Sequence, residues 1–138
     1  MEHMLLTEKV IGAAFKVYNS MGFGFLESVY EKCLMIELSK AGLRAKSQQP
    51  IIVRYDDRIV GEFFADIIVE EKIILELKSA SKLVAAHEVQ LVNYLVATGV
   101  ETGLLINFGP EKVEVKRKFR KLAPSHPVNP VILSKMES

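Results

Sequence analysis

The sequence predicts a single α/β domain in which helices flank a mixed β-sheet. Three observations support this class. Residues 5–42 carry apolar side chains at helical spacing, residues 50–79 are rich in β-branched and aromatic residues, and a helical segment at 83–97 then separates two further apolar runs. A strand, a helix and a second strand in succession typically form a parallel crossover. The expected order of elements is therefore α-α-β-β-β-α-β-β.

Two helices are expected in the N-terminal part. Residues 5–20 place apolar side chains three and four positions apart, and the segment Gly22–Gly24 interrupts this pattern. A second amphipathic pattern follows from Leu26 and stops at Gly42, a residue suited to a helix C-terminus. Glu27 should therefore lie in the first turn of the second helix.

The middle of the chain is expected to form a meander of three strands. From Pro50, the runs IIVRY and RIVGEFFADIIV flank a turn at Asp56 and Asp57, and KIILELK forms the third strand. The helix at residues 83–97 should end at Gly99.

Two further strands and a tail should complete the chain. GLLINF reads as a buried strand, parallel to residues 73–78, and KVEVKRKF as an alternating edge strand. Residues 124–138 contain three prolines and should form an extended tail, which leaves residues 1–123 as the domain.

Composition limits the function classes. The chain has 138 residues, is 49% hydrophobic and 25% charged, and carries one cysteine, so it needs no disulfide to fold. We expect a cytoplasmic protein without a membrane partner, because no signal peptide or membrane span is visible. A net charge of +1 argues against nonspecific coating of nucleic acid. Motifs of serine hydrolases, P-loop proteins, paired-cysteine sites and zinc proteases are missing from the sequence.

Three charged residues interrupt the apolar strands of the meander. If residues 63–69 pair with residues 73–79, Asp66 lies opposite Glu76, and Glu76 and Lys78 share its face. Two facing carboxylates repel each other, and a divalent cation such as Mg²⁺ would relieve the repulsion. Taken alone, the three residues also fit a surface salt-bridge cluster.

The spacing from Asp66 through nine residues to Glu76-x-Lys78 resembles the PD-(D/E)XK nuclease superfamily. The resemblance runs from about residue 5 to residue 120 and therefore covers nearly the whole chain. It implies a restriction-endonuclease-like fold and a nuclease that depends on Mg²⁺ or Mn²⁺, with DNA as the expected substrate. Lys78 would orient the attacking water or stabilise charge on the phosphate.

Two further motifs extend the resemblance. Gly24, Glu27 and Tyr30 in GFLESVY fit the pattern of the GxxExxY protein family, a branch of the superfamily, and Gln90 and Tyr94 in QLVNY fit the QxxxY motif of RecB-like nucleases. Glu27 would join the two strand carboxylates as a metal ligand, although a glutamate there also stabilises a helix N-terminus. Gln90 would contact the metal-bound water or a phosphate, and Tyr94 would stack on a base or contact the backbone.

Basic residues are concentrated near the C-terminal end of the domain. Lys116 and Arg117 belong to the stretch KVEVKRKFRK, which could form a stripe beside a phosphate backbone or simply a solvated edge strand. Two rival functions remain open. One is a non-catalytic module that keeps the fold and binds nucleic acid or a protein, and the other is a subunit that becomes active only as a homo-oligomer or in a complex.

Overall fold

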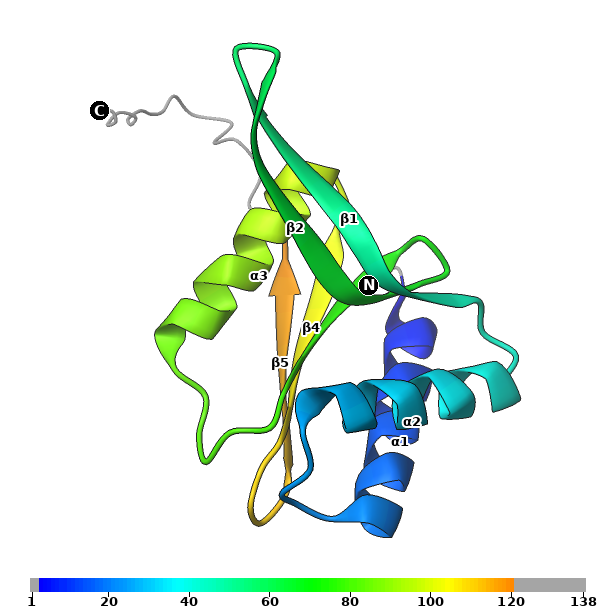
Figure 1. Cartoon of the computed structure of the whole chain (residues 1–138). Coiled ribbons are helices and arrows are strands. Elements are labelled where there is room, and N and C mark those ends of the chain that lie inside the picture. Colours follow the sequence, from blue (N-terminus) through cyan, green and yellow to red (C-terminus); the bar gives the residue numbers. More distant parts are fainter. Residues whose placement is uncertain (1–2, 121–138) are drawn as a thin grey trace.

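The computed structural model describes residues 3–120, and five strands in this part form one mixed sheet (Figure 1). The strands lie side by side in chain order; the third and fourth are parallel, and the other neighbours are antiparallel. They are β1 (Ala45–Tyr55), β2 (Arg58–Val69), β3 (Ile73–Lys78), β4 (Thr102–Phe108) and β5 (Val113–Phe119). The predicted fold class, element order and parallel pairing are thus confirmed. The tail predicted at residues 124–138 lies outside the described residues.

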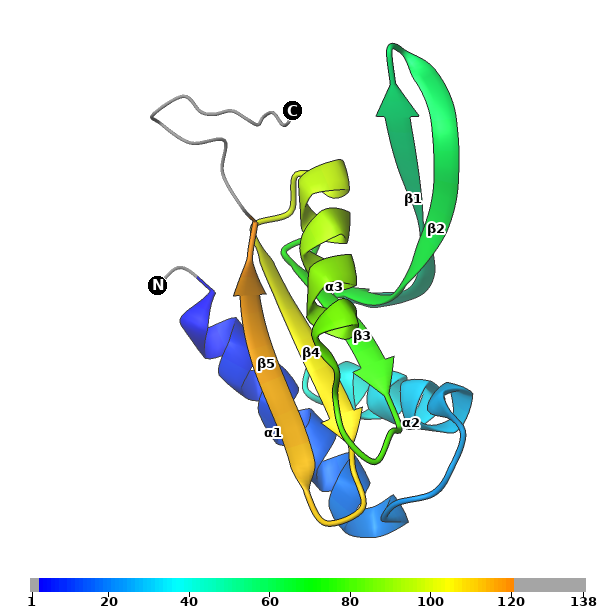
Figure 2. The same cartoon turned by 90° about the vertical axis from the view of Figure 1, so that its left-hand side faces the viewer.

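Three helices cover the two faces of the sheet (Figure 2). Helices α1 (Met4–Met21) and α2 (Glu27–Lys40) pack on one face, where Leu34, Leu75 and Leu104 are fully buried. Helix α3 (Ala85–Thr98) packs on the other face over Ile74 and Leu105. No helix in residues 3–120 is both long and apolar enough to cross a membrane.

The pairing of β2 differs from the expectation. Residues 63–65 pair with β1, as the predicted meander requires, but they do not pair with β3 as expected, because β2 meets β3 only over Ile67–Val69. Strands β1 and β2 therefore leave the sheet together as a long hairpin, which we call the β1–β2 arm (residues 45–69; Figure 2). Its turn is at Asp56 and Asp57, as predicted, and both have positive φ angles, 53° and 62°, as a tight hairpin turn requires.

Strand β1 also begins earlier than expected. It starts at Ala45, whereas the sequence pattern suggested a start at Pro50. A proline lacks the N–H group that a central strand needs, but it is tolerated in an edge strand, and β1 is the edge of this sheet. The polar segment Ser47–Gln49 is therefore part of the strand.

Candidate active site

The two strand carboxylates lie where β2 and β3 separate. The ladder ends at the pair Ile67–Leu75, and the next residues in the same register are Asp66 and Glu76. There the side chains replace ladder hydrogen bonds: the Asp66 N–H donates to Glu76 Oε1 at 3.2 Å, and the Leu77 N–H donates to Asp66 Oδ2 at 2.7 Å. The structure therefore places Asp66 opposite Glu76, as the sequence predicted.

Both carboxyl groups are costly to ionise in this position. Glu76 is 6% exposed, and its pKa is raised to about 8, first by burial and then by repulsion from Asp66. The pKa of Asp66 is also raised, mainly by burial and further by the charge of Glu27, although the hydrogen bond from Leu77 opposes the shift. Burial, more than the repulsion expected from the sequence, is thus the main source of electrostatic cost.

The donor set of the site suits a hard divalent cation. Asp66 and Glu76 offer carboxylate oxygens, and Mg²⁺ in proteins is usually held by one or two carboxylates together with waters and substrate phosphate. Ion pairs between described residues lie elsewhere, for example between Arg44 and Glu70 and between Lys118 and Glu88. No group of three or more His, Cys, Asp or Glu side chains in residues 3–120 could by itself hold a metal ion. Water or substrate would have to complete the coordination.

Glu27 is brought to the site by the start of α2. The helix begins at Glu27, as predicted, and this exposed carboxylate is close enough to raise the pKa values of Asp66 and Glu76. Gly24, with φ of +116°, allows the preceding turn. Its neighbours Phe25 and Leu26 line a shallow pocket together with Glu27.

Tyr30 fixes this helix start from inside the protein. Its ring is fully buried and stacks on Phe108 with 4.3 Å between ring centres. Its hydroxyl donates a hydrogen bond to the carbonyl of Gly22 and accepts one from the Phe25 N–H at 3.4 Å. Tyr30 therefore packs between helix and sheet, and its hydroxyl group also holds the loop that leads to Glu27.

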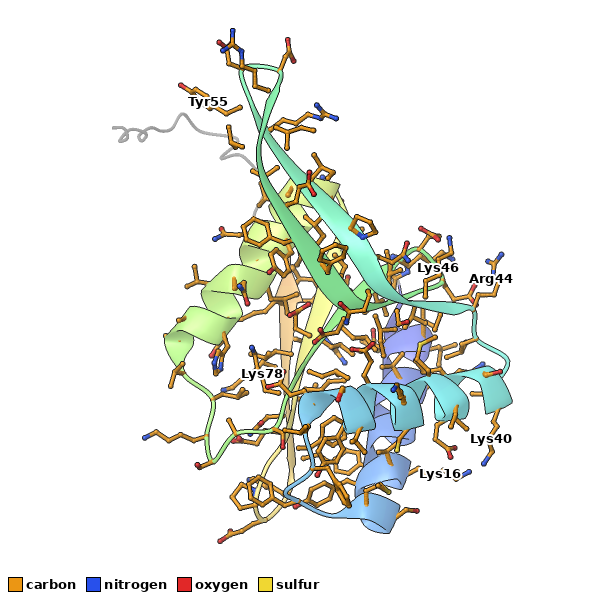
Figure 3. All side chains as sticks on the ribbon, viewed as in Figure 1. Lys16, Lys40, Arg44, Lys46, Tyr55 and Lys78 are labelled. Atoms are coloured by element: carbon orange, nitrogen blue, oxygen red, sulfur yellow. The ribbon has the colours of Figure 1, made fainter. Side chains whose placement is uncertain are left out.

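Lys78 is the last residue of β3 and shares the face of Glu76, since the two are separated by one residue. Figure 3 shows its side chain between the N-terminal ends of α2 and α3. Its positive charge lowers the pKa values of both Asp66 and Glu76. The structure thus brings the whole predicted D-E-K set together.

Asn107, which the sequence reading missed, supports the chain beyond Lys78. It pairs with Lys78 across β3 and β4 and is fully buried. Its side-chain amide donates to the Ala80 carbonyl at 3.0 Å and accepts from the Ala80 N–H at 2.9 Å. The signal was present: one amide stands in the otherwise apolar run LLINF, and a buried amide must find partners.

Helix α3 contributes Tyr94 and Gln90. Tyr94 is 8% exposed and contacts Phe63 of the arm with 5.7 Å between ring centres. Burial and the carboxylates of Glu76 and Asp66 raise the pKa of Tyr94. Its ring is therefore largely buried and offers little surface for stacking on a base, while its hydroxyl group is close enough to the acidic pair for their charges to raise its pKa.

A groove runs between α3 and the β1–β2 arm. It has a volume of about 1080 Å³, and Gln90, Asn93 and Tyr94 line its α3 side. Arg54 and Phe63 line the arm side. Gln90 is exposed in this groove, and Asp66, Glu76 and Lys78 are not among the residues that line it.

Residues 112–120, the described part of the basic stretch, do not form one stripe, and Lys121 lies outside the described residues. Strand β5 is an edge strand separated from β3 by β4, and its successive residues alternate between faces. Lys116 and Lys118 lie on the α3 face, where Lys118 pairs with Glu88 at 2.6 Å, whereas Arg117 lies on the α1 face. Lys116 and Arg117 are therefore not brought together, and neither adjoins the carboxylate pair.

Two more polar residues border the site. Gln48 of β1 and Glu31 of α2 were not singled out from the sequence, yet Gln48 Nε2 donates to Glu31 Oε1 at 2.9 Å. Burial and the charge of Asp66 raise the pKa of Glu31. No motif spacing marks these residues, because they come from different elements and meet only in the fold.

Comparison with known proteins identifies the superfamily of this chain. The model of the PD-(D/E)XK nuclease superfamily matches residues 4–118, so the chain belongs to this superfamily. The narrower assignment to the GxxExxY branch stays a prediction.

One solved structure, described as "Crystal structure of SSO0001", resembles this chain in fold. Its TM-score is 0.55 at 19% sequence identity, and the match covers 70% of this chain and 51% of that one. This chain therefore spans about half the length of that structure, and the likeness concerns the fold alone. No curated protein matches this chain.

Proposed function

We propose that this protein is a metal-dependent nuclease that hydrolyses phosphodiester bonds, with DNA as the expected substrate. The observation that carries the proposal is the pair of half-buried Asp66 and buried Glu76, held beside Lys78 where β2 and β3 separate. Two carboxylates that are costly to ionise gain most from a divalent cation, and such a pair is a feature of functional sites more often than of ordinary surfaces.

The residues have separate roles in this mechanism. Bound Mg²⁺ or Mn²⁺ would supply Lewis-acid polarisation of the scissile phosphate and a water of lowered pKa. Asp66 and Glu76 would hold the ion, and Glu27 would reach it directly or through a water. Lys78 would not bind the metal ion; it would orient the attacking water or stabilise the charge that develops on the phosphate.

Substrate contacts would come from α3 and, farther away, from β5. Gln90, which is exposed in the groove, would hydrogen-bond a phosphate oxygen or the attacking water. Tyr94 would contact the nucleic acid through its hydroxyl group rather than by stacking of its ring. Lys116 and Arg117 would contact phosphates distant from the scissile bond, since they lie two strands away from β3.

A cleavage assay tests the proposal directly. Purified protein is incubated with linear, circular and single-stranded DNA and with RNA, in Mg²⁺, in Mn²⁺ and in EDTA. Cleavage that requires the metal and leaves 5′-phosphate ends is the expected result. Full-length substrate under all metal conditions, together with no heat of Mn²⁺ binding in calorimetry, would contradict the proposal.

A non-catalytic binding module is the second candidate. It is favoured by the lack of a ready three-ligand metal group in residues 3–120 and by a net charge of only +1. Such a module would bind nucleic acid or a protein equally well in EDTA and in Mg²⁺ and would cleave nothing. Sedimentation analysis in the same buffers would show whether activity, where present, belongs to a homo-oligomer.

A further inference from the structure

Gln48 has an unusual backbone conformation for a residue inside a strand. Its φ angle is +52°, in the left-handed region that L side chains disfavour. The neighbouring pairs Ser47–Ile67 and Gln49–Ala65 keep one register, and Gln48 stands between them at the position opposite Asp66, where the pairing is skipped. Strain of this kind persists only where the surroundings compensate it, and it is often found at functional sites.

The side chain of Gln48 lies between two carboxylates. Its amide donates to Glu31 Oε1 at 2.9 Å, and its place opposite Asp66 in the strand register brings it close enough to lower the pKa of that carboxyl group. A primary amide has two N–H donors, so it can serve both acceptors and still carry no charge. A lysine here would neutralise the carboxylates and compete with a cation, whereas glutamine leaves their charge available.

Asp66 is thereby approached from two sides. The Leu77 N–H holds Oδ2 at 2.7 Å from the β3 side, and Gln48 approaches from the β1 side. We propose that Gln48 is a positioning residue: by bridging Asp66 and Glu31 it keeps the Asp66 carboxylate in the single orientation needed to hold a divalent cation. The catalytic consequence rests on the proposed nuclease function, but the orientation of Asp66 can be tested without it.

Three variants separate the effect of the Gln48 side chain from the effect of its strained backbone. Gln48→Gly removes the amide and adopts a positive φ without strain, whereas Gln48→Ala removes the amide and keeps the strain. We therefore expect Gln48→Gly to melt no lower than wild type and Gln48→Ala to melt lower. The matched control is Gln49→Ala, since Gln49 is the neighbouring half-buried glutamine and its amide donates to the Ser47 carbonyl at 3.4 Å.

The first measurement uses the metal-free protein. The Leu77 amide proton reports on the bond to Asp66, so loss of the Asp66 orientation should move its NMR signal upfield. Its hydrogen exchange should become about tenfold faster in both Gln48 variants and stay unchanged in Gln49→Ala. A Leu77 amide with wild-type shift and exchange in Gln48→Gly would overturn the proposal, whatever the activity of the protein.

The second measurement uses Mn²⁺ and substrate. Both Gln48 variants should bind Mn²⁺ about tenfold more weakly and lose kcat with little change in KM, since the amide acts on a metal ligand and not on the substrate. An unchanged Mn²⁺ affinity in Gln48→Gly would also contradict the positioning role. If wild type neither binds Mn²⁺ nor cleaves, the proposed function fails, and the Leu77 amide alone decides the role of Gln48.

Discussion

Asp66 and Glu76 are joined through the backbone of Asp66, whose N–H donates to the Glu76 carboxylate at 3.2 Å. In the opposite direction, the Leu77 N–H of β3 donates to the Asp66 carboxylate at 2.7 Å. Side-chain hydrogen bonds thus join β2 and β3 beyond the last pair of the backbone ladder, and both carboxylates are oriented in the absence of a ligand. Orientation in advance lowers the cost of assembling a charged site.

Lys78→Met should keep metal binding and lose cleavage. The carboxylates that would hold the ion remain, while the ammonium that serves the reacting phosphate is removed. Calorimetry with Mn²⁺ and a cleavage assay on the same sample test both halves. Lys16→Met is the control, because Lys16 lies on α1 away from Lys78 and pairs only weakly with Glu37 at 3.4 Å (Figure 3). Cleavage by Lys78→Met within about tenfold of wild type, a barrier change of ~1.4 kcal/mol, would deny Lys78 an essential chemical role.

Metal-free protein should lose stability as pH rises. The pKa of Glu76 is raised from 4.5 to about 8, so between these values the folded state binds more protons than the unfolded state. The free energy of unfolding should therefore fall across this window, by up to ~1.4 kcal/mol per pH unit, and the raised pKa of Asp66 acts in the same direction. Chemical denaturation in EDTA from pH 4.5 to 8.5 measures the slope. The Glu76→Gln variant should flatten it, and equal slopes in the two proteins would contradict the burial of an ionisable Glu76.

Removing one charge of the pair should raise the stability of the metal-free protein and abolish its stabilisation by metal. At pH 8.5, Glu76→Gln or Asp66→Asn should raise the stability of the metal-free protein, by ~1 kcal/mol or about 3 °C in melting temperature from the lost repulsion alone, and further because no charge remains to be buried. Wild type should gain ~1.4 kcal/mol when free Mg²⁺ is about ten times its dissociation constant, and the variants should gain nothing. Thermal melts in EDTA and across a Mg²⁺ titration test this. Variants that melt lower than wild type in EDTA and still respond to Mg²⁺ would make both residues structural.

Gln90→Ala should lower turnover without affecting the fold. Gln90 is exposed in the groove beside α3, and such a helix position tolerates truncation, so the melting temperature should change by less than about 2 °C. Asn93→Ala is the matched control, since Asn93 lines the same groove one position short of Tyr94. Equal losses of turnover in the two variants would assign the effect to the groove in general and not to Gln90.

Tyr94→Phe should separate the role of the hydroxyl group from that of the ring. The ring, which packs against Phe63, is retained, so stability should change little. Loss of the hydroxyl group, whose pKa is raised by Glu76 and Asp66, should reduce turnover. Tyr55→Phe is the control, because Tyr55 is 75% exposed in the arm (Figure 3). A fall of more than about 4 °C in the melting temperature of Tyr94→Phe would instead place the hydroxyl in a structural hydrogen bond.

The parts of the fold that the sequence predicted well depend on local rules. The turn at residues 70–72 sets the offset between β2 and β3, and this offset alone places Asp66 opposite Glu76. Gly99, with φ of +78°, ends α3 for the same local reason. The division of Lys116 and Arg117 between two faces also follows from strand alternation and could have been foreseen.

Other features depend on choices between distant segments. Residues 63–65 pair with β1 on one edge, and the same apolar pattern would also suit pairing with β3 on the other edge, so the departure of the arm was not visible in the sequence. The role of Gln48 was hidden for a similar reason. Its contacts with Glu31 and Asp66 join three elements, and a positive φ at a glutamine has no compositional signal.

The irregular backbone of β1 also bears on how this protein avoids its own copies. An unpaired strand edge is a template on which another chain can add a strand, and β1 presents such an edge along the arm. Gln48 turns the backbone out of the extended conformation, and two residues later Pro50 lacks an N–H to offer. These two residues interrupt the regular row of donors and acceptors along β1. The backbone of Gln48 thus disfavours the addition of a strand from another copy at this edge of the sheet.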